Sequence, residues 1–243
     1  MTTTYQDSTG DVFGNIHRIF TSLPNKLEKD VRDHLKNVYG TLALALGCAV
    51  LGVLFNNVMQ FEAMQFVFTL GIFGLMIAIV STEANSFNEN KRLAYMFGLS
   101  FLVGIQTGPL IEYVGADDPS IVFNAYLITM IVFGCFTMMA LHADSTKYLY
   151  LGGMLSSALL CLLITSLIAP YSPYVRSAVI WAGLAINCGF VVYDTQLIAE
   201  KCRRGDKDYI WHTVMLFVDF VNIFRYVMIL LKDKSEKDKR RRD

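Results

Sequence analysis

The chain alternates between long apolar runs and short polar segments. Seven runs stand out, at residues 38–59, 61–80, 93–114, 121–141, 148–169, 175–198 and 210–231. Each has roughly the ~20 mostly apolar residues that a helix needs to cross a bilayer. The runs lack the strict alternation of a barrel strand, and open strands cannot satisfy their backbone groups in lipid. The pattern therefore predicts an all-α fold, a polytopic membrane bundle of seven transmembrane helices.

Basic residues in the connecting segments predict how the bundle is oriented. Residues 26–36 and the loops on the same side hold eleven Lys and Arg residues, whereas the opposite loops hold only Arg176. The positive-inside rule places the polar segment 1–37 in the cytosol, ahead of a transmembrane domain at 38–231. The charged tail at 232–243 carries seven further cations, which lie outside if all seven runs cross the membrane.

The seventh run is the least certain span, because it contains His212, Asp219, Asn222 and Arg225. Two alternatives stay open. Either all seven runs cross the membrane, or six cross and the seventh re-enters, which would return the basic tail to the cytosol.

Composition agrees with a membrane protein and excludes several classes. Only 17% of the residues are charged and 54% are hydrophobic, whereas a soluble domain carries about 25% charged residues. The formal net charge is zero, without the basic field of a nucleic-acid binder. The five cysteines have no zinc-ligand spacing. We expect membrane lipid as the surrounding partner, no nucleic acid and no cofactor.

Enzymatic motifs are missing from the sequence. It contains no H-E-x-x-H, no G-x-S-x-G and no phosphate-binding loop. A paired-aspartate intramembrane protease is the nearest chemistry, but its second aspartate follows Gly-x-Gly, and here Val218 precedes Asp219. We therefore expect that the protein is not an enzyme. Short loops and the lack of an outer cysteine pair also disfavour a seven-helix receptor.

Two acidic residues lie deep within apolar runs. Asp194 and Asp219 are the only acids in the sixth and seventh runs. Asp194 lies seven residues before Lys201 and Asp219 ten residues after Tyr209. At 1.5 Å per residue, these separations place the two acids about 10 Å and 15 Å from the cytosolic side. The two runs are antiparallel neighbours joined by a short loop, so we expect the two carboxyl groups to meet. Arg225 lies about 240° further round the helix from Asp219, which disfavours a direct pair within that helix and leaves a pair across helices open.

A carboxyl pair in the bilayer predicts a gate that responds to pH and to cations. Two close carboxyls take up and release protons as a unit. With one shared proton they form a hydrogen-bonded latch, and with none they repel each other or attract a hard cation such as calcium. Asn222 and Arg225 are possible accessories. Glu112, after a Gly108–Pro109 pair expected to unwind its helix locally, is a third.

Several motifs resemble the Bax inhibitor-1 family. They are GFVVYDTQLIAE at 189–200, GDKDYIWH at 205–212 and LFVDFVNIFR at 216–225, together with LKNVYGTLAL at 35–44, KRLAYMFGLSFLVGIQTGPLIEY at 91–113 and YLYLGGMLSSAL at 148–159. The resemblance implies a seven-helix bundle in the endoplasmic reticulum membrane with the last helix central. It also implies a pH-sensitive calcium leak, suppression of stress-induced cell death, and Bcl-2-family proteins and stress sensors of the endoplasmic reticulum as partners.

The family's paired aspartates match Asp194 and Asp219. Bacterial members also use an arginine near the end of the second span as a latch. Here residues 79–83 hold no basic residue, so closure is expected to rest on the shared proton alone. Two functional hypotheses follow. One is a calcium leak in which calcium is the transported ion, bound transiently by Asp194 and Asp219. The other is a non-conducting regulator that binds Bcl-2-type and stress-sensor proteins.

Overall fold

The computed structural model describes residues 28–59, 64–116, 118–142, 150–168 and 173–241. Within these ranges the chain is helical and has no strand. Each helix coincides with one predicted run, which confirms the all-α membrane bundle. The helices are α2 (Lys29–Met59), α3 (Gln65–Ser81), α4 (Glu89–Gly115), α5 (Ser120–His142), α6 (Leu151–Ile168), α7 (Pro173–Arg203) and α8 (Tyr209–Arg240).

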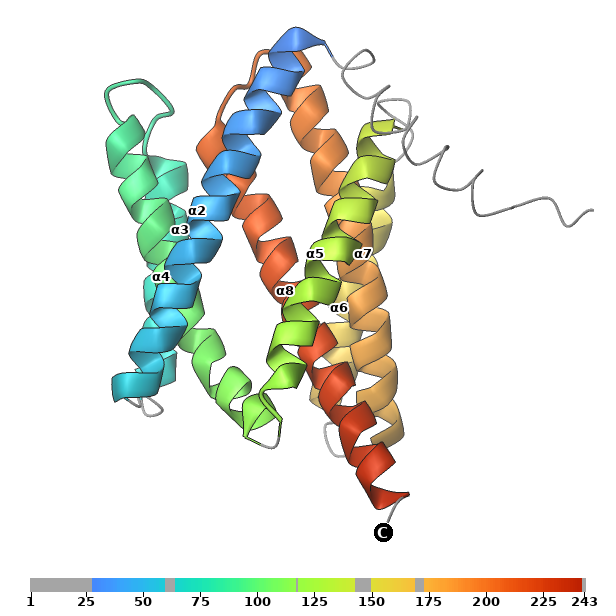
Figure 1. Cartoon of the computed structure of the whole chain (residues 1–243). Helices are drawn as coiled ribbons and strands as arrows, with labels where there is room; N and C mark the ends of the chain where they lie inside the picture. Colours follow the sequence, from blue (N-terminus) through green and yellow to red (C-terminus); the bar gives the residue numbers. More distant parts are fainter. Residues whose placement is uncertain (1–27, 60–63, 117, 143–149, 169–172, 242–243) are drawn as a thin grey trace, which may run out of the picture.

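The helices alternate in direction along the bundle (Figure 1). The start of α2 lies at the same end as the α3–α4 turn and the α7–α8 loop, and α8 finishes at the opposite end. The end of the bundle with the start of α2 is named the N-terminal end, and the end where α8 finishes is named the C-terminal end. α8 packs against α2, α4, α5 and α7, which makes it the central helix, while α6 packs against α7 at the periphery.

Large apolar side chains cover the outside of the bundle, among them Leu44, Phe66, Ile131 and Leu167. Soluble monomers rarely expose continuous apolar surface on this scale, so the surface is suited to lipid. Six of the described helices are long and apolar enough to span a membrane, and α3 is shorter, with 17 residues. A span of that length is at the lower limit for a bilayer. The span of marginal length is thus the second and not the seventh.

α8 is one uninterrupted helix from Tyr209 to Arg240. A re-entrant segment has to reverse its direction within the membrane, and α8 keeps one direction throughout, which favours the seven-span alternative. The helix also continues into the stretch predicted as a separate tail at 232–243. There Lys232 is 5% exposed and lies over the ring of Tyr113, and Asp233 pairs with Arg176 at 3.5 Å. Residue 232 marks a change of composition within a continuous helix.

α2 and α4 cross closely at two glycines. A Cβ at Gly52 would overlap the carbonyl oxygen of Phe101, and a Cβ at Gly104 would overlap the carbonyl of Ala49. Small residues permit this approach of two backbones in a membrane. α4 also remains helical through Pro109, so the predicted unwinding is wrong. Instead the last turns of α4 run obliquely toward the start of α5 (Figure 1).

Candidate functional site

The two buried aspartates lie together at the interface of α7 and α8. Asp194 is 8% exposed and Asp219 is 5% exposed. Their carboxyl groups interact directly across the interface. Among the described residues, none forms a hydrogen bond of ordinary geometry with Oδ2 of Asp219, so the contact between the two groups is loose. The fold thus brings together the two residues that the sequence singled out.

Apolar neighbours surround the carboxyl pair. Asp194 shares its face of α7 with the buried Val191 and Ile198. Asp219 shares its face of α8 with the buried Leu216 and Ile223. In such surroundings two negative charges in contact repel each other with little screening. A direct contact between the two groups is therefore favourable only while at least one of them holds a proton.

The three accessory candidates lie apart from the pair. Arg225 donates from Nε and Nη2 to the hydroxyl of Thr107 on α4, at 3.2 and 2.6 Å, and thus pairs across helices with a neutral partner. Glu112, also on α4, accepts a 3.4 Å hydrogen bond from Nδ2 of Asn56. Asn222 is half-buried, and no hydrogen bond joins it to either aspartate within the described part of the chain. None of these residues completes the carboxyl site.

A buried arginine stabilises the N-terminal end of the bundle. Arg92, in the first turn of α4, is 4% exposed and donates at 3.3 Å to the carbonyl of Ile79 near the end of α3. Its guanidinium also donates to both carboxylate oxygens of Asp208, at 2.8 and 2.5 Å. The second span therefore does end beside a basic residue, supplied by α4. This arginine binds the start of α8 and not the carboxyl pair.

Asp208 is also the N-cap of α8, because it accepts a 3.1 Å hydrogen bond from the backbone N–H of Trp211. Burial alone would raise the pKa of Asp208. The hydrogen bonds from Arg92 and Trp211, with the charge of Arg92, outweigh burial and hold this pKa below its usual range. The sequence reasoning missed the pair, although an aspartate three residues ahead of Trp211 is a typical N-cap signal.

Two histidines, which the sequence reasoning also missed, meet in the core near this end. Nε2 of His34 on α2 lies 2.8 Å from Nδ1 of His212 on α8, and both side chains are buried. One residue further along α8, the hydroxyl of Thr213 donates to the carbonyl of Val38. A polar contact therefore links α2 to α8 between the loop and the carboxyl pair. Nothing in the spacing along the chain signals a contact between residues 34 and 212.

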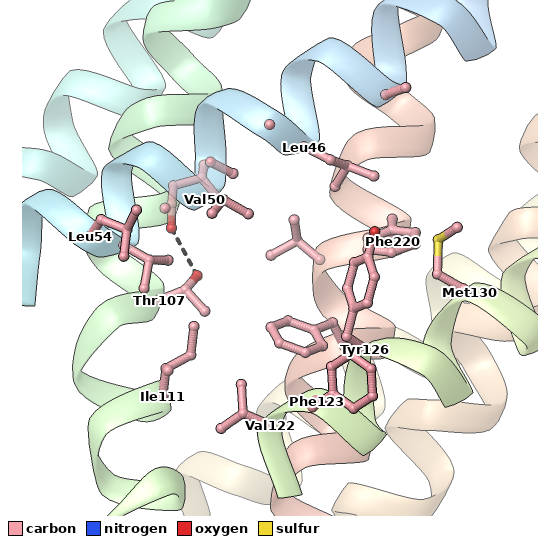
Figure 2. A pocket seen from close by; sticks show the side chains of 18 of the residues that line it. Leu46, Val50, Leu54, Thr107, Ile111, Val122, Phe123, Tyr126, Met130 and Phe220 are labelled. Carbon is pink, nitrogen blue, oxygen red and sulfur yellow. Dashed lines mark hydrogen bonds between the residues drawn. The ribbon is translucent and has the colours of Figure 1, made fainter. Parts of the chain in front are cut away.

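A lateral cavity of about 650 Å³ lies between α2, α4, α5 and α8 (Figure 2). Its walls are almost wholly apolar, and Thr107 contributes one of the few polar groups. Phe220, the residue after Asp219, forms part of its wall and stacks edge-on against Tyr126 and Phe133. The carboxyl pair itself does not line this cavity. Asp219 thus faces α7 while its neighbour faces the cavity.

The described residues contain no cluster of three or more His, Cys, Asp or Glu side chains able to hold a metal ion. A bound calcium ion takes 6–8 oxygen ligands, and the pair supplies at most four carboxylate oxygens. The pair alone therefore offers fewer oxygen ligands than a bound calcium ion takes.

Comparisons with known proteins agree with the motifs. The model of the family described as "Inhibitor of apoptosis-promoting Bax1" matches residues 31–236. The chain is 42% identical to Bax inhibitor 1 of Homo sapiens over 212 residues, covering 86% of this chain and 89% of the relative. It is 42% identical to Bax inhibitor 1 of Bos taurus, at 87% and 90% coverage, and 38% identical to that of Arabidopsis thaliana, at 90% of each chain. A multi-pass membrane protein with a match of this extent belongs to the Bax inhibitor-1 family.

Proposed function

We propose that the protein is a pH-sensitive calcium leak of the endoplasmic reticulum membrane that suppresses stress-induced cell death. The direct contact between the buried carboxyls of Asp194 and Asp219 carries the conducting part of this proposal. Isolated acids inside a membrane bundle are costly, so a pair of them usually serves ion or proton movement.

The chemistry of the pair supplies a gate. While one proton is shared, the contact holds α7 against α8. When the proton leaves, two negative charges face each other in apolar surroundings, and the pair either separates or binds a divalent cation. Calcium then acts as the transported ion, held by the two carboxylates for the moment of passage.

Family membership supports the role in cell death. Proteins named Bax inhibitor 1 from animals and plants align with about nine-tenths of the chain. On that basis we assign Bcl-2-family proteins and stress sensors of the endoplasmic reticulum as candidate partners. The exposed basic end of α8, which includes Lys234, Lys237 and Arg240, offers a charged surface at the end of the bundle opposite the start of α2.

Calcium efflux from liposomes that contain only the purified protein tests the conducting role. We expect efflux without any partner and a rate that changes with pH. Asp33→Asn removes an exposed carboxyl that pairs with Lys36 at the surface, and serves as the matched control. Efflux no faster than from protein-free liposomes at every pH would contradict the leak.

The second candidate function is the non-conducting regulator, and the exposed basic end of α8 favours it. That protein would give no efflux alone, yet would still protect cells. Charge-reversing substitutions at Lys234 and Lys237 would then abolish protection without changing the fold.

A further inference from the structure

Buried polar atoms without partners gather on one side of the carboxyl pair. Within the described residues, nine buried side-chain nitrogen and oxygen atoms have no hydrogen-bond partner. Those of Arg32 and His142 lie at the N-terminal end of the bundle, and those of Asn56 and Gln65 lie toward the C-terminal end. The other five lie on α2, α5, α7 and α8 and belong to Tyr39, Thr137, Thr195, His212 and Asp219. Native proteins satisfy such atoms with protein groups or ordered water, so this concentration needs an explanation.

Three hydroxyls from different helices form the middle of this group. The phenol oxygen of Tyr39 on α2 lies within interaction range of the hydroxyls of Thr137 on α5 and Thr195 on α7. Yet each of the three oxygens is fully buried and lacks a hydrogen bond of ordinary geometry. They are close enough to share a partner but do not satisfy one another. Water, which donates and accepts, is the ligand that suits three hydroxyls in this arrangement.

A second position suited to a bound water lies nearer the N-terminal end of the bundle. Nε2 of His212 has no hydrogen-bond partner among the described residues, and Oδ2 of Asp206 is 3.9 Å away. A polar separation just beyond hydrogen-bond length is typical of a bridging water. The other ring nitrogen of His212 is already engaged with His34 at 2.8 Å.

These groups lie at successive depths along the bundle. Tyr39 follows His34 by five residues on α2, or roughly 7.5 Å at 1.5 Å per residue. The hydroxyl of Thr213, bonded to the carbonyl of Val38, lies between these two levels. At the end of this series nearest the carboxyl pair, Thr195 directly follows Asp194 in the sequence. The polar groups thus extend from the α7–α8 loop to the carboxyl pair within the core of the bundle.

We propose that these groups bind a file of ordered water molecules that runs from the N-terminal end of the bundle to the Asp194–Asp219 pair. Waters at the hydroxyl cluster and at His212 would satisfy the unpaired atoms at once. Leaving a buried polar atom unsatisfied destabilises a fold, so the bound water stabilises the bundle where it is held. Its role as the aqueous access to the gate rests on the proposed function, whereas the water sites themselves do not.

Radiolytic hydroxyl-radical labelling of the full-length protein tests the water sites without any reference to calcium. Radicals form from water, so a buried side chain is oxidised only where water is bound next to it. We expect oxidation of Tyr39 well above that of Phe217, a fully buried ring outside this group of polar atoms. Replacing the two threonines by valine, which has the same shape, should reduce oxidation of Tyr39 several-fold. Oxidation of Tyr39 at the level of Phe217 in the unmodified protein would overturn the proposal.

Efflux measurements test the role of the file. Tyr39→Phe removes one hydroxyl and keeps the ring, and Tyr126→Phe makes the same change at the lateral cavity as a control. We expect Tyr39→Phe to slow calcium efflux several-fold without moving the pH at which efflux is half-maximal, and the control to leave both unchanged. Unaltered efflux in Tyr39→Phe would overturn the access role. If the unmodified protein gives no efflux while Tyr39 is still labelled, the proposed leak fails and the water sites stand.

Discussion

At the residue scale, the behaviour of Asp194 and Asp219 depends on their neighbours. An aspartate at a water-exposed position carries its charge at little cost. Here both carboxyls are buried, each shares its helix face with branched apolar side chains, and each has the other as a direct contact. We therefore expect the two carboxyls to take up and release protons jointly, so that a change at one alters the state of the other.

Asp219→Asn is expected to weaken the leak and to remove most of its pH dependence. The amide keeps the shape of the side chain, but the site loses one charge and the proton that the pair shared. A charge-assisted contact is worth about 1.5–3 kcal/mol, so the pH-dependent part of the efflux should fall by about tenfold or more. Asp194→Asn should act similarly, and the double variant should add little, because coupled residues are not additive. Efflux from liposomes at a series of pH values measures this, and an unchanged profile in both single variants would mean that the gate lies elsewhere.

Asp208→Asn tests the second charged contact at this scale. Asparagine can still cap α8, so the substitution mainly removes the ion pair with Arg92. The pKa of Asp208 is lowered in the folded protein, which keeps its carboxylate at pH values where the unfolded chain has already taken up a proton. The pair therefore stabilises the fold above the ordinary aspartate pKa of about 3.9, and the stabilisation is lost as pH falls through the lower folded value.

At neutral pH we expect Asp208→Asn to cost about 1–2 kcal/mol, less than a fully buried pair because Asp208 is partly exposed. The difference between variant and unmodified protein should narrow only below about pH 4. Thermal unfolding in detergent at several pH values measures it. A difference that instead narrows between pH 6 and 8 would show that a group other than Asp208 is titrating.

At the scale of the helix, α8 decides how the bundle is organised. It packs against four other helices. It begins after Asp208, which pairs with Arg92, and it carries His212, which contacts His34, and the buried Asp219. Much of it was predictable: the apolar run, the depth of Asp219 and the antiparallel pairing with α7. Its continuation to Arg240 was not predictable, because charged residues normally end an apolar run, whereas here Lys232 is buried and lies over the ring of Tyr113.

The α2–α4 crossing gives a prediction at this scale. Gly52→Ala and Gly104→Ala each place a methyl group against a backbone carbonyl of the facing helix, which cannot move aside as a flexible side chain would. We expect each to destabilise the protein by at least about 2–3 kcal/mol.

Gly40→Ala is the matched control, since a Cβ there meets no atom within 4 Å. It should be neutral or stabilising by about 0.5–1 kcal/mol, because alanine favours a helix over glycine. Midpoints of thermal unfolding in detergent compare the three variants. Equal midpoints for all three would show that the two helices do not cross closely in the membrane.

At the scale of the whole molecule, seven alternating helices place the start of α2 and the finish of α8 at opposite ends of the bundle (Figure 1). We therefore expect tags at the two termini to lie on opposite sides of the membrane. Protease digestion of sealed microsomes checks this, with detergent-opened microsomes as the control. Digestion of both tags in sealed vesicles would contradict the arrangement. Such an outcome would mean that one of the seven helices, with the short α3 foremost, does not cross.

The sequence by itself determined that this is a helical membrane protein, which family it belongs to, and which two carboxyls lie deep in the bundle. Apolar run length and buried charge are local properties, and each is visible in a single stretch of chain. The tertiary structure decided which distant groups meet. Arg92 and Asp208, His34 and His212, and Tyr39 and Thr195 are each more than 100 residues apart. Only the packing of α2, α4 and α7 around α8 brings these side chains together, because contacts between helices depend on how the helices pack and leave no periodic mark in the chain.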